Sequence, residues 1–156
     1  MSVSKMLTGH DIFRSFLPEQ VAAISKCASA RKLEKGDIIY QPDRKATHVF
    51  VLLDGQVELR LPSGTSELGF LVSRVSKGEL FGIAPLLKSE CYTTSALCTR
   101  ASKVLFIEAK PLIEMLSNHP LLGFKIMTVV AGAYFSRYQS LIERVQRALS
   151  DLAVEE

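Results

Sequence analysis

The sequence predicts an α+β domain, an antiparallel β-roll (a jelly-roll-like double-stranded sandwich) flanked by N-terminal helices and a long C-terminal helix. Three observations predict this class. Apolar side chains recur at helical spacing within residues 10–28 and again within residues 110–152. Residues 29–108 instead form short apolar runs with turn signals every ~8–12 residues. We expect residues 1–156 to form one domain.

The N-terminal region is expected to be helical. Pro18 suits the first turn of a helix, because the N–H that proline lacks would be unpaired there. Val21, Ile24 and Ala28 follow at helical spacing, which predicts an amphipathic helix over residues 18–28. A shorter helical turn is expected around residues 10–14.

The middle region is expected to supply the strands of the roll. Residues 49–53 are β-branched, aromatic or aliphatic, which is typical of a strand buried on both faces. Asp54 and Gly55 predict a tight hairpin turn, and the alternation over residues 57–61 predicts a half-exposed partner strand. Further strands are predicted at residues 38–40, 68–75, 92–99 and 103–108.

The C-terminal region predicts a helix over residues 110–116 and a long helix from Pro120 to about Leu152. Along the long helix, side chains recur at alternating intervals of four and three residues, the a/d pattern of a coiled coil. They are Met127, Ala131, Tyr134, Tyr138, Leu141, Val145, Ala148 and Leu152. A helix of this length exceeds what a small roll needs, although it could also pack entirely on its own roll. We therefore expect homodimerisation through Tyr134, Tyr138, Leu141, Val145 and Leu152.

Composition and motif content argue against several classes of protein. The formal charge of +3 is spread along the chain, and no helix-turn-helix follows the long helix, so direct DNA binding is not expected. The three cysteines and three histidines lack metal-ligand spacing. No signal segment or membrane-length apolar run is apparent, which favours a cytoplasmic protein. No acid–base pair or nucleophile motif indicates an enzyme.

Four signatures in this order resemble the cyclic-nucleotide-binding domain family, which includes the sensor half of catabolite activator protein and the regulatory subunits of protein kinase A. They are the early turn at residues 33–39, the strand and hairpin at 49–57, Gly78-Glu79-Leu80-Phe81-Gly82, and the final strand–helix–break–long helix. The resemblance covers about residues 10–150. It implies a cyclic nucleotide such as cAMP or cGMP, or another small anionic metabolite, bound at a phosphate-binding cassette over residues 78–95.

The resemblance also implies which residues of the cassette contact the ligand. They are Phe81, Gly82, Ile83, Ala84, Leu86, Tyr92, Thr93 and Thr94. Ile83 and Tyr92 stand where the family carries the Glu and Arg that hold the ribose and the phosphate. Since a charge-assisted hydrogen bond nets ~1.5–3 kcal/mol, losing both predicts cAMP and cGMP affinity weaker by roughly two to four decades.

Three charged residues near the cassette are candidates to replace the missing side chains. They are Lys88, Glu79 and Glu90, although a solvent-facing charge is the favoured interpretation of each. Tyr92 has two equally weighted interpretations: it stacks on a ligand with its hydroxyl bonding that ligand, or it is a strand aromatic that covers the roll.

Two functions follow from this pattern. In the first, the chain is a regulatory module in which a ligand in the roll shifts the C-terminal helices, and a downstream protein partner or the twin subunit responds. In the alternative, the pocket is vestigial and the chain is a ligand-independent dimeric scaffold.

Overall fold

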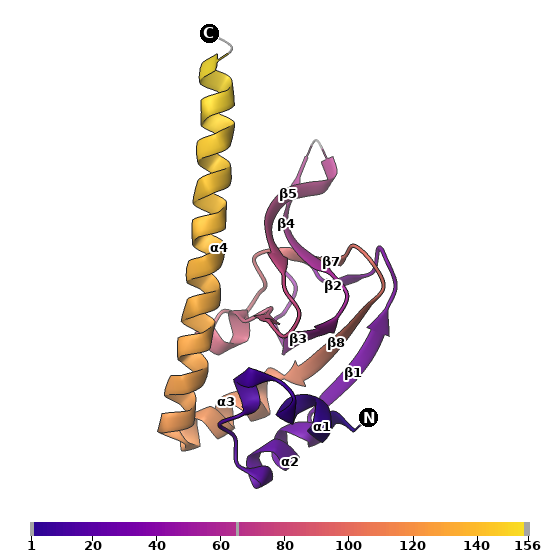
Figure 1. The fold of residues 1–156 in the computed structure, drawn as a ribbon, viewed down its shortest axis with the longest axis vertical. Helices are drawn as coiled ribbons and strands as arrows, with labels where there is room; N and C mark the ends of the chain where they lie inside the picture. The colour runs from indigo at the N-terminus through magenta and orange to yellow at the C-terminus, as the bar shows by residue number, and fades with distance from the viewer. Residues whose placement is uncertain (1, 65, 155–156) are drawn as a thin grey trace.

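A computed structural model describes residues 2–64 and 66–154. Two antiparallel sheets form a roll, and the N-terminal helices and the long C-terminal helix pack against it, so the predicted fold class is confirmed (Figure 1). The helices are α1 (Val3–Thr8), α2 (Pro18–Lys26), α3 (Ala109–Asn118) and α4 (Pro120–Val154), with 3₁₀ turns η1 (Asp11–Phe13) and η2 (Ala84–Leu87). The strands are β1 (Ala28–Leu33), β2 (Ile38–Tyr40), β3 (His48–Asp54), β4 (Val57–Ser63), β5 (Ser66–Val75), β6 (Leu80–Phe81), β7 (Ser95–Cys98) and β8 (Ser102–Glu108).

The two sheets have the strand orders β1-β8-β3-β6 and β2-β7-β4-β5. Every pairing in them is antiparallel. The central strand β3 is buried on both faces, as its β-branched and aromatic composition predicts. Alternate residues of β3 therefore point into two separate cores.

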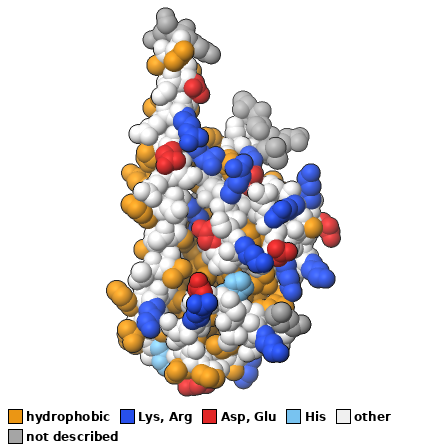
Figure 2. All heavy atoms as spheres, in the orientation of Figure 1, with side chains coloured by type: hydrophobic (Ala, Val, Ile, Leu, Met, Phe, Trp, Pro, Cys, Tyr) orange, Lys and Arg blue, Asp and Glu red, His pale blue; other side chains and the backbone are white. Residues whose placement is uncertain are grey.

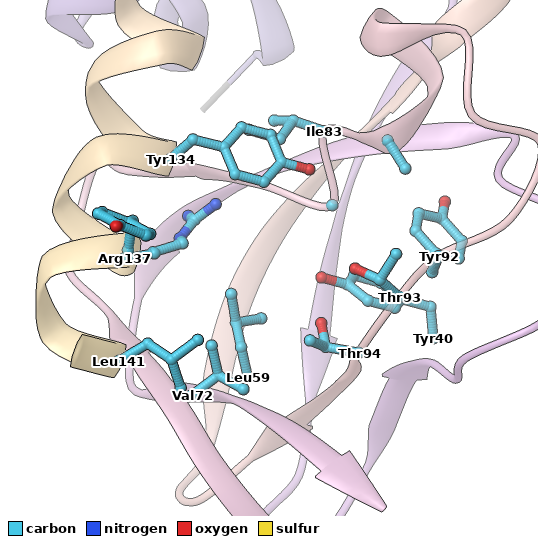
Figure 3. Close-up of a pocket in the computed structure, with 13 residues that line it drawn as sticks. Tyr40, Leu59, Val72, Ile83, Tyr92, Thr93, Thr94, Tyr134, Arg137 and Leu141 are labelled. Atoms are coloured by element: carbon cyan, nitrogen blue, oxygen red, sulfur yellow. The ribbon is translucent and has the colours of Figure 1, made fainter. Parts of the chain in front are cut away.

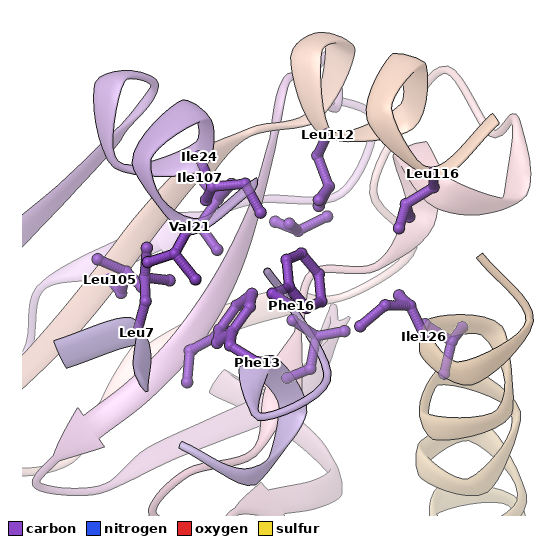
Figure 4. Packing of buried hydrophobic residues seen from close by; sticks show 14 of the residues in the cluster. Leu7, Phe13, Phe16, Val21, Ile24, Leu105, Ile107, Leu112, Leu116 and Ile126 are labelled. Atoms are coloured by element: carbon purple, nitrogen blue, oxygen red, sulfur yellow. The ribbon is translucent and has the colours of Figure 1, made fainter. Parts of the chain in front are cut away.

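One core lies between the first sheet and the helices, and the other lies inside the roll. Val49 and Val51 of β3 join the first core, where Phe13, Ile24 and Ile126 meet them from the helices (Figure 4). Phe50 and Leu52 of the same strand join the second core. The roll and the helices are thus packed on opposite faces of one strand.

The N-terminal helices differ in detail from the prediction. Helix α1 was not expected; its first turn is capped by the Ser2 hydroxyl, which accepts from the Lys5 N–H at 3.4 Å. The turn expected at residues 10–14 is the short 3₁₀ helix η1. Helix α2 begins at Pro18 as predicted, but it ends at Lys26 because Ala28 already pairs with Ile107 of β8.

The hairpin between β3 and β4 lies at Asp54 and Gly55, as predicted, and Gly55 has a φ of +101°. The strand expected over residues 92–99 is shorter than predicted and begins at Ser95. Residues 92–94 instead line a cavity between the roll and α4, so they do not pair in a ladder.

The long helix α4 contacts its own domain along one face. Leu122, Ile126, Val130 and Arg137 are its buried residues, and they follow helical spacing. Only its C-terminal end extends beyond the strands (Figure 1). Among the described residues, no helix has both the length and the apolar character that membrane crossing requires.

Candidate ligand-binding site

A cavity of about 250 Å³ lies between the cassette, the second sheet and α4. Its lining is mostly apolar and aromatic, and it comes from β2, β4, β5, both ends of the cassette and α4 (Figure 3). The lining residues are Tyr40, Leu59, Val72, Gly82, Ile83, Ala84, Tyr92, Thr93, Thr94, Tyr134, Arg137, Tyr138 and Leu141. This cavity is slightly smaller than the ~300–1,000 Å³ usual for small-molecule sites.

Of the eight cassette residues expected to contact a ligand, six line this cavity: Gly82, Ile83, Ala84, Tyr92, Thr93 and Thr94. The other two lie outside the lining. Phe81 is fully buried in the roll core, where it stacks with Phe50 at a centroid distance of 5.4 Å. Leu86 packs against the helical core instead.

Tyr92 forms a wall of the cavity by stacking on Tyr40, with ring centroids 4.0 Å apart and planes 18° from parallel. Its hydroxyl donates to the His48 carbonyl at 2.7 Å and accepts from the His48 N–H at 3.3 Å. Both hydrogen bonds of the hydroxyl are therefore made with the backbone of β3, while the ring lines the cavity. Burial raises the pKa of Tyr92, so the hydroxyl stays protonated and can donate.

The hydroxyl of Tyr40 is the polar group on the opposite side of this stack. Burial raises the pKa of Tyr40 well above its usual range, although a hydrogen bond with Thr94 and the charge of Arg137 both lower it. Tyr40 is accordingly a neutral hydrogen-bond donor on the cavity wall.

Arg137 brings a positive charge to the cavity from α4. Its side chain is only 8% exposed, and one terminal nitrogen donates to the Leu80 carbonyl at 2.7 Å. Its Nε is buried with no hydrogen-bond partner, and no described residue forms an ion pair with it. Figure 3 shows the guanidinium extending from α4 toward the cavity.

The three charged residues considered near the cassette do not line the cavity. The Glu79 carboxylate accepts from the Ser76 N–H at 2.7 Å and so closes its own turn. Lys88 ends η2 with a φ of +58°, and both Lys88 and Glu90 are exposed. Sequence reasoning did not predict a role for Arg137. Helical spacing places Arg137 on the same face as Val130, Tyr134 and Leu141, but it does not show that this face meets the roll.

The residues predicted to form a dimer seam occupy two environments. Tyr134 and Leu141 line the cavity, whereas Val145 and Leu152 are exposed; Tyr138 borders the cavity and is 60% exposed. Exposed apolar residues, three of which belong to the predicted seam, follow spacings of three and four from Phe135 to Leu152, with Leu121 and Phe124 nearer the start of the helix, and we call this set the outer stripe. It comprises Leu121, Phe124, Phe135, Tyr138, Ile142, Val145, Leu149 and Leu152. Figure 2 shows hydrophobic side chains along the outer edge of α4.

The cysteines and metal-binding side chains give no second site. Cys27, Cys91 and Cys98 are free thiols, and burial raises the pKa of both Cys27 and Cys98, which disfavours the reactive thiolate. The described part of the chain contains no cluster of three or more His, Cys, Asp or Glu that could hold a metal ion.

Replacing Tyr92 by Phe should lower the free energy of unfolding by about 1 kcal/mol, because the His48 backbone loses its hydroxyl partner. Urea denaturation measures this change. Tyr138→Phe, at an exposed tyrosine on α4, is the matched control and should change stability little. Equal stabilities for the two variants would contradict the assignment of the Tyr92 hydroxyl to β3.

Comparison with known proteins agrees with this geometry. Residues 30–119 match the family described as Cyclic nucleotide-binding domain. A structure described as a cyclic nucleotide-binding protein from Geobacter metallireducens is 31% identical, with a TM-score of 0.75 over 88% of this chain and 99% of that one. The sensor domain of the transcriptional regulator DNR from Pseudomonas aeruginosa is 17% identical, with a TM-score of 0.71 over 83% of this chain and 91% of that one.

A protein described as a potassium channel from Rhodopseudomonas palustris is 23% identical over 78% of this chain. The chain spans only 29% of the length of that relative. Because the family match covers more than half of the chain, the chain belongs to the cyclic nucleotide-binding domain family. The sensor domain of DNR shares the fold of this chain.

Proposed function

We propose that the chain is a ligand-sensing regulatory domain whose cavity reports occupancy through α4. The observation that carries the proposal is the shared lining: Gly82 and Ala84 of the cassette face the same cavity as Tyr134 and Arg137 of α4. A ligand in the cavity therefore contacts the roll and the helix at once. If α4 has two placements on the roll, such a ligand shifts the population toward the placement that it fits better.

The lining supports altered recognition of cyclic nucleotides. At the family's Glu position, Ile83 is 2% exposed and belongs to the helical core. None of the described lining residues carries a carboxylate to accept the ribose hydroxyl. Affinity for cAMP and cGMP is accordingly weak, and another small anionic metabolite is the alternative ligand.

Thermal unfolding of the purified chain with millimolar cAMP or cGMP tests this function. A ligand at 100 times its Kd stabilises a fold by ~2.7 kcal/mol, and we expect a smaller but measurable rise here. Thr94→Phe, which places a ring in the cavity, is the control and should not respond. An unchanged midpoint for the wild type with both nucleotides would contradict a retained cyclic-nucleotide sensor.

The outer stripe of α4 supports a second candidate function, a ligand-independent dimeric scaffold. Phe124, Phe135 and Leu149 are each more than 60% exposed, which is unusual for an isolated domain surface. Pairing of two α4 helices would cover them as a coiled coil. Under either function we propose a homodimer through α4 that a downstream protein binds. We also propose a cytoplasmic location, where the free thiols stay reduced.

A further inference from the structure

The cavity holds a buried charge that no ion pair among the described residues neutralises. Arg137 is 8% exposed, and its Nε is buried with no partner. A buried guanidinium without a counter-charge is costly, because it has lost its water and gained no anion in return. Its hydrogen bond to the Leu80 carbonyl satisfies one terminal nitrogen but supplies no negative charge.

The surroundings of Arg137 define the rest of a ligand. Leu59, Val72 and Leu141 offer an apolar surface, and Tyr92, whose ring is stacked on Tyr40, adds an aromatic wall. Tyr40 adds a protonated hydroxyl facing the same space as the guanidinium (Figure 3). The volume of about 250 Å³ lies just below the range usual for small-molecule sites, which favours a small ligand.

We infer that Arg137 is the anion anchor of this cavity and that the cavity takes a small organic acid with a flat apolar body. The acid group binds Nε and its neighbouring nitrogen, for which the planar guanidinium fork is suited. The body lies against the tyrosine wall. This inference rests on the proposed ligand-sensing function and names the ligand class for the same cavity.

The anchor has a consequence for signalling. A cassette arginine would hold an anion to the roll, whereas Arg137 belongs to α4. Neutralising Arg137 therefore acts directly on the helix that moves. The charge of the ligand, and not only its shape, then sets the placement of α4.

The test uses the full chain, thermal unfolding, and NMR of the arginine Nε–H groups. The probes are benzoate and phenyl phosphate, which share a flat ring and differ in the acid group, with neutral benzamide as the uncharged control. We expect either acid to raise the unfolding midpoint and to shift the Arg137 Nε–H resonance, while benzamide does neither. The larger response identifies whether a carboxylate or a phosphate is the preferred group.

Two variants decide whether Arg137 is the anchor. Arg137→Met should bind the acids about 10- to 100-fold more weakly, the loss expected for a charge-assisted contact. Arg147→Met, at an exposed arginine on the same helix that does not line the cavity, should bind them as the wild type does. Far-UV circular dichroism checks that both variants are folded.

The failures are distinguishable when cAMP is included as a further probe. Equal responses of the wild type and Arg137→Met to the acids or to cAMP overturn the anchor but leave a ligand-sensing cavity. A response of the wild type to cAMP and to neither acid also overturns the anchor alone. If none of the three probes changes the wild type, the anchor and the proposed sensor function fall together.

Discussion

Replacing Gly55 by Ala should lower the free energy of unfolding by about 3 kcal/mol, a large fraction of the ~5–15 kcal/mol that stabilises a typical domain. Gly55 has a φ of +101°, which L residues rarely adopt, and this strain costs ~1–3 kcal/mol. A Cβ there would also lie 2.5 Å from the Ser102 Cα and 2.6 Å from its Cβ. Because a backbone atom cannot move aside alone, the β3–β4 hairpin and β8 must separate.

Gly36→Ala is the matched control for this prediction. Gly36 has a similar φ of +93°, but a Cβ there would meet nothing within 4 Å. Its cost is therefore the backbone strain alone, about 1 kcal/mol. Urea denaturation of the two variants isolates the contribution of the Ser102 contact. Equal losses would show that the hairpin adapts to the extra carbon.

Glutamate at two positions of the outer stripe should convert the proposed dimer into a monomer. Phe135 and Leu149 are 62% and 61% exposed, and in a two-fold pairing each would be buried twice. Each lost apolar side chain costs ~1.5–3 kcal/mol, so Phe135→Glu with Leu149→Glu should weaken association by more than about 1,000-fold. Light scattering after size exclusion measures the mass.

The control places the same two charges elsewhere on α4. Ser136→Glu with Ser150→Glu changes exposed residues beside the outer stripe and should leave the dimer intact. The unfolding midpoint of each double variant shows whether the domain itself survives. A wild-type chain that is monomeric at tens of micromolar would reject dimerisation through α4.

The elements that sequence predicted well carry a strong local pattern. In β3, five consecutive apolar residues alternate between the two faces of the strand, so burying all of them requires both faces to be covered. The glycine that follows fixes the hairpin. Strand β1 has no such pattern, because Arg31 and Lys32 lie within it and its burial is irregular. Strand β6 has only two residues, too few for any periodicity.

The cassette residues of the site were predictable through resemblance, but Arg137 was not. Its role depends on where α4 crosses the roll, which is a tertiary fact that helical spacing does not contain. Which of the two apolar runs on α4 faces the roll also depends on where the helix crosses it. Tyr134 and Phe135 are neighbours in sequence, and each starts a run with spacings of three and four. Only the packed structure places Tyr134 on the cavity and leaves Phe135 in the outer stripe.

The hydrogen bond from Arg137 to the Leu80 carbonyl joins α4 to the roll at a point about which the helix can tilt. From Arg137 to Leu152 the helix rises by about 22 Å at 1.5 Å per residue. A tilt of only about 10° at Arg137 would therefore displace the far end by roughly 4 Å, nearly one turn of helix. Under the proposed sensing function, a rearrangement at the cavity too small to disturb the roll would become, at the C-terminal end of α4, a movement large enough for another protein to detect.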